Sequence, residues 1–81
     1  MNKDALRQKL LETMPPIFSR QQVKELTGGM IDGRTVANMD SQGRGPGKVA
    51  LGPVKVGYVR EAFIDWFLDR LSFQDQAGGD Q

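Results

Sequence analysis

Residues 41–60, SQGRGPGKVALGPVKVGYVR, restrict the possible folds more than any other stretch of this chain. They contain five glycines and two prolines, so no long helix can pass through them. Two β-prone runs, KVAL and VKVGYV, lie on either side of Gly52-Pro53, and the second alternates between apolar and other residues. The segment therefore predicts a β-hairpin. A hairpin of this size is not stable alone, so it must pack on the rest of the chain.

Short helices are predicted on both sides of this segment. The clearest start signals are a capping box formed by Ser19 and Gln22, and an N-cap at Asp32. The predicted helices cover residues 3–13, 20–27, about 33–42 and 60–71. Only about four residues, Gly28 to Ile31, join the second helix to the third. Two short helices joined so tightly must cross steeply, as in a helix-turn-helix.

Composition excludes several kinds of site. The chain has 81 residues, which is enough for one domain, and it has no cysteine and no histidine. It therefore lacks disulfides, thiolate zinc sites and the commonest general base. Its glycines match neither a P-loop nor a complete dinucleotide-binding motif. Glu61, Asp65 and Asp69 recur at helical spacing, which is typical of a solvated helix face. We expect no enzyme activity, no catalytic residue, no cofactor and no metal.

Charge is distributed unevenly along the chain, although the net charge is +1. Residues 20–60 carry seven basic and three acidic groups, whereas residues 61–81 carry one basic and five acidic groups. A basic middle segment beside an acidic end indicates an anionic partner for one face of the molecule.

The third predicted helix carries side chains suited to reading DNA. Arg34 and Asn38 are four residues apart and therefore share a helix face, and Thr35 lies beside them. Arginine recognises guanine and asparagine recognises adenine in the major groove, mostly from the N-terminal part of a recognition helix. Arg34, Thr35 and Asn38 are therefore the predicted base contacts.

The order of these features resembles the small winged helix-turn-helix proteins of the excisionase and AlpA-type regulator group, which are related to the DNA-binding end of MerR-type regulators. The resemblance covers about residues 17–71, in FSRQQVKELTGG, RTVANMDSQGRGP, KVALG and GYVREAFIDWFLDRL. The matching positions are Gly28, Thr35, Gly43, Gly45, Pro46, Gly52, Tyr58, Arg60 and Trp66. In one departure, Pro53 stands where the group usually has a basic residue. The N-terminal helix, residues 1–16, lies outside the pattern.

The resemblance implies a mostly helical winged helix-turn-helix domain with one β-hairpin. Double-stranded DNA would be the partner, with the third helix in the major groove and the hairpin, or wing, against the backbone. The function would be that of an excisionase-like architectural factor or a small transcriptional regulator from a phage or mobile element. An integrase or recombinase, or further copies of the chain on DNA, would be additional partners.

Basic side chains around this surface are predicted to contact phosphate. They are Arg20, Arg44, Lys48, Lys55 and Arg60. About five such contacts predict a slope of roughly −4 to −5 when log affinity is plotted against log salt concentration.

A protein-interaction adaptor is the alternative function. Its working face would be the apolar side of the first helix, and the basic hairpin would dock an acidic partner. The apolar residues concerned are Leu6, Leu10, Leu11 and Met14.

The sequence also predicts the cellular location and the character of the C-terminal residues. No stretch approaches the roughly 20 apolar residues of a membrane span, and the N-terminus lacks a signal-peptide core, so we expect a cytoplasmic, nucleoid-associated protein without membrane contact. Residues 72–81 have no hydrophobic pattern and are expected to be a disordered tail.

Overall fold

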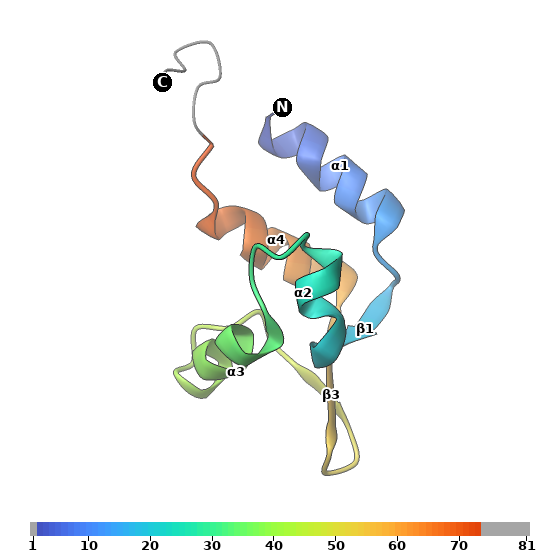
Figure 1. Ribbon diagram of the computed structural model, residues 1–81, viewed down its shortest axis with the longest axis vertical. Coiled ribbons are helices and arrows are strands. Elements are labelled where there is room, and N and C mark those ends of the chain that lie inside the picture. Colours follow the sequence, from blue (N-terminus) through green and yellow to red (C-terminus); the bar gives the residue numbers. More distant parts are fainter. Residues whose placement is uncertain (1, 74–81) are drawn as a thin grey trace.

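The computed structural model describes residues 2–73 and shows a small sheet from which one hairpin projects away from the helices (Figure 1). The helical elements are α1 (Lys3–Thr13), the 3-10 turn η1 (Arg20–Gln22), α2 (Val23–Leu26), α3 (Gly33–Ser41) and α4 (Arg60–Arg70). The strands are β1 (Ile17–Ser19), β2 (Val49–Leu51) and β3 (Lys55–Val59). No helix within residues 2–73 is long and apolar enough to cross a membrane. Most of the expected disordered tail, residues 74–81, lies outside the described residues.

Helix boundaries follow capping residues, among them the Asp32 cap and the Ser19–Gln22 capping box that the sequence predicts. The side chains of Asn2 and Asp32 each accept a hydrogen bond of 2.8 Å from the backbone N–H three residues further on. Gln22 Oε1 accepts the backbone N–H of Ser19 at 2.9 Å, which is the reciprocal half of a capping box. Gly43 has a φ of 74° and ends the turn that follows α3.

β1 is the strand that the sequence did not predict. It pairs antiparallel with β3 and places Phe18 opposite Tyr58, while β2 pairs with the other edge of β3, so the strand order is β1-β3-β2. The expectation of a mostly helical fold with a single hairpin is therefore corrected to a mixed α/β domain with a three-stranded sheet. Three residues are too few to show alternation, and the Pro15-Pro16 pair suggested only a helix stop.

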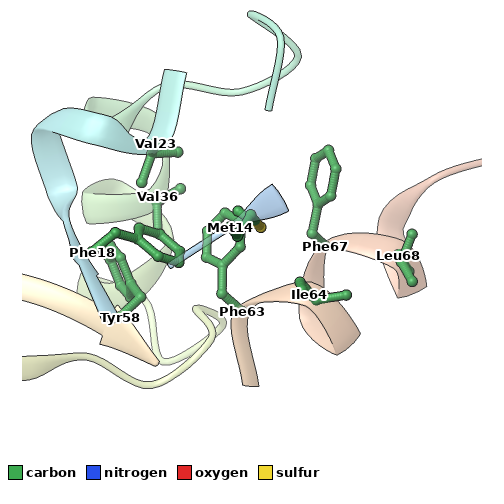
Figure 2. Close-up of a cluster of buried hydrophobic side chains, with 9 residues drawn as sticks. All are labelled: Met14, Phe18, Val23, Val36, Tyr58, Phe63, Ile64, Phe67 and Leu68. Atoms are coloured by element: carbon green, nitrogen blue, oxygen red, sulfur yellow. The ribbon is translucent and has the colours of Figure 1, made fainter. Parts of the chain in front are cut away.

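The core lies between one face of the sheet and the helices, and aromatic rings occupy its centre. The ring centroid of Phe63 is 5.2 Å from that of Phe18, 5.7 Å from Tyr58 and 5.9 Å from Phe67. Within residues 2–73, nine buried side chains make up the core: Met14, Phe18, Val23, Val36, Tyr58, Phe63, Ile64, Phe67 and Leu68 (Figure 2). They come from β1, α2, α3, β3 and α4, and from the residue after α1, so one core holds these elements together.

α1 is attached to the core through its apolar face and through two arginines. Arg60 Nη1 donates to the carbonyl oxygens of Leu11 and Met14, at 3.2 and 3.3 Å. Arg7 Nε donates to Asp65 of α4 at 2.8 Å. The side chains of α1 that pack against the core are Leu6, Leu10 and Leu11. α1 is therefore an integral part of the packed structure.

α3 packs closely on η1 because its first residue is glycine. A Cβ atom at Gly33 would lie 2.5 Å from the carbonyl oxygen of Arg20 and 2.8 Å from its Cγ. Glycine normally weakens a helix, but here it lets α3 and η1 touch.

We expect Gly33→Ala to lower the free energy of unfolding by about 1–3 kcal/mol, because the backbone of Arg20 has to move. Helix propensity alone would instead raise the free energy of unfolding, since alanine favours a helix by roughly 1 kcal/mol over glycine. Urea unfolding followed by circular dichroism measures the difference. Ser41→Ala, at the exposed end of the same helix, serves as the control and should stay within about 0.5 kcal/mol of wild type. A Gly33→Ala protein as stable as wild type would show that α3 does not need this close approach.

Candidate nucleic-acid interface

α3 has a buried face and an exposed face. Val36 is fully buried, whereas Arg34, Thr35 and Asn38 are exposed. Within residues 2–73, no hydrogen bond or ion pair engages the side chains of Arg34 and Asn38. The structure therefore brings the three predicted base-contact residues together on the first two turns of one helix face.

The start of α3 is held by Asp32. Hydrogen bonds from the backbone and side chain of Thr35 lower the pKa of Asp32. The capping carboxylate therefore stays ionised well below neutral pH.

A hydrogen-bonded network of Arg20, Asp40 and Tyr58 lies beneath α3. Asp40 Oδ2 accepts from Arg20 Nη2 at 2.9 Å and from the Tyr58 hydroxyl at 2.8 Å, and Arg20 Nε donates to that hydroxyl at 2.9 Å. The Asp40 side chain is only 6% exposed, so these hydrogen bonds replace contacts with water. The network joins η1, α3 and β3.

The network also shifts two pKa values. Burial, reinforced by Asp40, raises the pKa of Tyr58, although the hydrogen bond from Arg20 acts in the opposite direction. Burial alone would lower the pKa of Arg20, but its hydrogen bonds to Tyr58 and Asp40 outweigh that effect and raise the pKa. At neutral pH the network therefore contains a charged arginine and a neutral phenol.

The loop between α3 and β2 is held against α4. The carbonyl oxygen of Arg44 accepts from Trp66 Nε1 at 2.8 Å and from Arg70 Nη2 at 2.9 Å, and the Arg70 guanidinium lies 4.8 Å from the Trp66 ring centroid. A Cβ atom at Gly45 would collide with the Asp40 carboxylate. The backbone of this loop is thus fixed from both sides, while the Arg44 side chain remains exposed.

The five predicted phosphate contacts separate into two groups. The guanidinium of Arg20 is engaged in the network, and that of Arg60 donates to the carbonyl oxygens of Leu11 and Met14 and to Glu61 at 2.7 Å. The N–H groups of these two arginines therefore already donate hydrogen bonds to acceptors of the protein itself. The exposed members, whose side chains have no partner among the described residues, are Arg44, Lys48 and Lys55.

α3 and the β2–β3 hairpin project from the same end of the molecule, away from α1 (Figure 1). Two of the three acidic groups of α4, Glu61 and Asp65, are paired with arginines. Hydrogen bonds from Arg60 and Arg7 lower the pKa values of Glu61 and Asp65, respectively. Over the described part of the chain, no three acidic side chains are grouped to hold a metal ion.

Sequence reasoning missed two features of this region. The only signal for the network is that Asp40 is the single acid within residues 33–60. The second feature is a shallow groove of about 460 Å³ on the outer face of the sheet, lined in part by the exposed side chains of Ile17, Val49 and Leu51. β1 is only three residues long, so its sequence shows no alternation of apolar and polar residues from which this groove could be predicted.

Comparison of the chain with protein-family models, curated proteins and solved structures finds no match. Support for a function therefore comes from the geometry and chemistry of the exposed α3 face and of the β2–β3 hairpin.

We expect Tyr58→Phe to cost about 1–2 kcal/mol of unfolding free energy, because Asp40 loses a donor in a buried site. The aromatic ring, and with it most of the core packing, is retained. Thr13→Ala removes an exposed hydroxyl on α1 and should change the stability by less than about 0.5 kcal/mol. Equal stabilities for Tyr58→Phe and wild type in denaturant titrations would show that the network contributes nothing.

The ionisation of Tyr58 gives a pH test, since it is the only tyrosine in the chain. Its pKa is raised above the ordinary value of 10.0 in the folded state. Below pH 10 the phenol is protonated in both states; above it the unfolded chain loses the proton first. Folding stability should therefore fall as the pH rises through the folded pKa. Phenolate absorbance should appear at higher pH in the native protein than in urea; coincident titration curves would contradict the burial of this hydroxyl.

Proposed function

We propose that this protein binds duplex DNA in a sequence-specific manner as a winged helix-turn-helix domain. The observation that carries the proposal is the exposed face of α3. Arg34, Thr35 and Asn38 lie together there, and the opposite face of α3 is fixed to the core by Val36 and to the network by Asp40. A rigidly held helix with free arginine and asparagine side chains suits the major groove, which is about 12 Å wide.

The order of elements supports the same proposal. α2 and α3 are joined by residues 27–32, and Gly28 and Gly29 supply positive φ angles of 64° and 84° in that turn. The β2–β3 hairpin follows α3 directly and projects beside it (Figure 1). In the proposed complex, α3 is the recognition helix and the hairpin is the wing.

Each residue on the exposed face of α3 has a defined role in this complex. Arg34 donates two hydrogen bonds to O6 and N7 of a guanine, and Asn38 pairs with N6 and N7 of an adenine. The methyl group of Thr35 contacts a thymine methyl. Sequence preference should therefore be concentrated in the few base pairs that face the first two turns of α3.

Phosphate contacts come from the three free cations Arg44, Lys48 and Lys55. Because Arg20 and Arg60 are engaged inside the protein, we reduce the expected salt slope from roughly −4 to −5 to about −3. In this assignment Arg20 and Arg60 position α3 and α1 without touching DNA.

The biological role that fits this chemistry is an excisionase-like architectural factor or a small transcriptional regulator, as the resemblance to that group suggests. The adaptor alternative receives no support from α1. Met14 is buried, and the other three apolar residues of its intended working face pack against the core. Selection of bound duplexes from a random pool tests the proposal directly: an enriched motif of a few base pairs is expected, and its absence at low salt would contradict DNA recognition.

Two substitutions should have different effects on DNA. Arg34→Ala should cost about 1–3 kcal/mol on the selected duplex and relax preference at one base pair, with little effect on random DNA. Lys55→Ala should weaken binding to both duplexes equally and reduce the salt slope by about one. Fluorescence anisotropy over a range of salt concentrations measures both effects.

Lys9→Ala is the matched control for these variants. Lys9 is exposed on α1, and no partner among residues 2–73 engages its side chain. Its removal should change neither the selectivity nor the slope. If Arg34→Ala and Lys55→Ala instead act alike on selected and random DNA, α3 is not the recognition helix.

A further inference from the structure

The tip of the β2–β3 hairpin is apolar and almost fully exposed. Val54 is 86% exposed and Leu51 is 78% exposed, more than any other large hydrophobic side chain in residues 2–73. Gly52 and Pro53 lie between them. Two large apolar groups at the end of a projecting hairpin are unfavourable in water, so the tip is suited to burial in a partner.

The tip is also held in shape before any partner binds. Gly52 adopts a φ of 67°, which permits the sharp turn, and the ring of Pro53 fixes its own φ. Behind the tip, β3 pairs with β2 over residues 55–57 and with β1 over residues 57–59, where the buried Tyr58 anchors it. Little conformational entropy is therefore lost when such a tip inserts into a partner.

The surrounding charge identifies the partner as a polyanion. Lys55 directly follows Val54, Lys48 lies at the base of the hairpin, and no acidic residue occurs between Asp40, which is buried, and Glu61. An apolar tip on a hairpin that carries two free cations is complementary to the DNA minor groove, whose edges are phosphates and whose floor is stacked bases.

We propose that Leu51 and Val54 form a wedge that enters the minor groove beside the site read by α3 and partly unstacks one base step. The inference rests on the proposed DNA-binding function. Paired strands lie about 4.8 Å apart before side chains are counted, and the minor groove is only about 6 Å wide, so entry has to open the groove. Apolar wedges that open a step kink the duplex toward the major groove by roughly 20–90°.

The wedge would select a base step by its stiffness. Pyrimidine–purine steps such as TA and CA unstack most easily, so the bound site should carry one at a fixed distance from the base pairs read by α3. This preference needs no hydrogen bond, and it concerns a position that Arg34 and Asn38 do not touch.

The test uses the duplex that the wild-type protein selects from a random pool, with its adenines replaced one at a time by 2-aminopurine. This adenine analogue becomes brighter when it unstacks. Wild-type protein should raise its fluorescence about threefold or more at one step, and energy transfer between dyes on the two duplex ends should increase because of the kink. The Leu51→Ser/Val54→Ser double variant should lose both signals, keep its base preference and change in affinity by less than about tenfold.

Ile17→Ser is the matched control. Ile17 is 59% exposed on the same outer face, but it pairs with Val59 at the end of the sheet away from the tip. This variant should retain both the unstacking and the kink.

Two results would overturn the wedge while leaving DNA recognition intact. In the first, wild-type protein binds the selected duplex without brightening any position. In the second, the signals persist in the Leu51→Ser/Val54→Ser double variant; the tip would then be available to a protein partner. Failure to bind any duplex at low salt would instead refute the proposed function, and the wedge with it.

Discussion

The carboxylate of Asp40 is the group on which the placement of α3 depends. It is nearly fully buried in the middle of a basic segment, and it joins α3 to η1 through Arg20 and to β3 through Tyr58. Removing one partner of a buried pair costs about 3–5 kcal/mol, because the remaining charge is left unpaired. Tyr58 extends this link into the core, since its ring packs 5.7 Å from Phe63 while its hydroxyl bonds to Asp40. The orientation of the exposed helix face is thus coupled to the packing of the whole domain.

Close backbone contacts are the second constraint, and they explain several glycines. Gly45 admits the Asp40 carboxylate, Gly33 admits the backbone of Arg20, and a Cβ atom at Gly57 would lie 2.5 Å from the carbonyl oxygen of Phe18. Each contact brings two segments together where a methyl group would separate them. In a domain of this size the hydrophobic core alone gives limited stability, so such contacts and the packing of α1 matter more than in a larger protein.

The sequence predicts most of the helices and the hairpin, but it predicts neither the pairing of β1 nor the hydrogen-bond partners of Arg20 and Arg60. Capping residues and prolines set the limits of α1 and α3, and the predicted last helix, residues 60–71, is observed as Arg60–Arg70. β1 was missed because three residues cannot show a period, and its pairing with β3 is a long-range contact. The engagement of Arg20 and Arg60 could not be predicted for a related reason. A cation in a basic segment is expected to face solvent, and only the fold brings Asp40 or the end of α1 within reach.

Because Arg20 and Arg60 are not free to contact phosphate, a DNA complex would have to gain more of its binding free energy from other contacts. With a slope of about −3, a fourfold rise in salt lowers affinity by about 60-fold, which implies a smaller phosphate contribution than five contacts would give. Short-range contacts must then supply most of the selectivity. Burial of Leu51 and Val54 would contribute about 1.5–3 kcal/mol each, and opening a base step costs a few kcal/mol. At a flexible step these terms nearly cancel, whereas at a stiff step the cost exceeds the gain. The hairpin tip would therefore add little affinity of its own, but it would make the affinity depend on a base step that lies beyond the reach of α3.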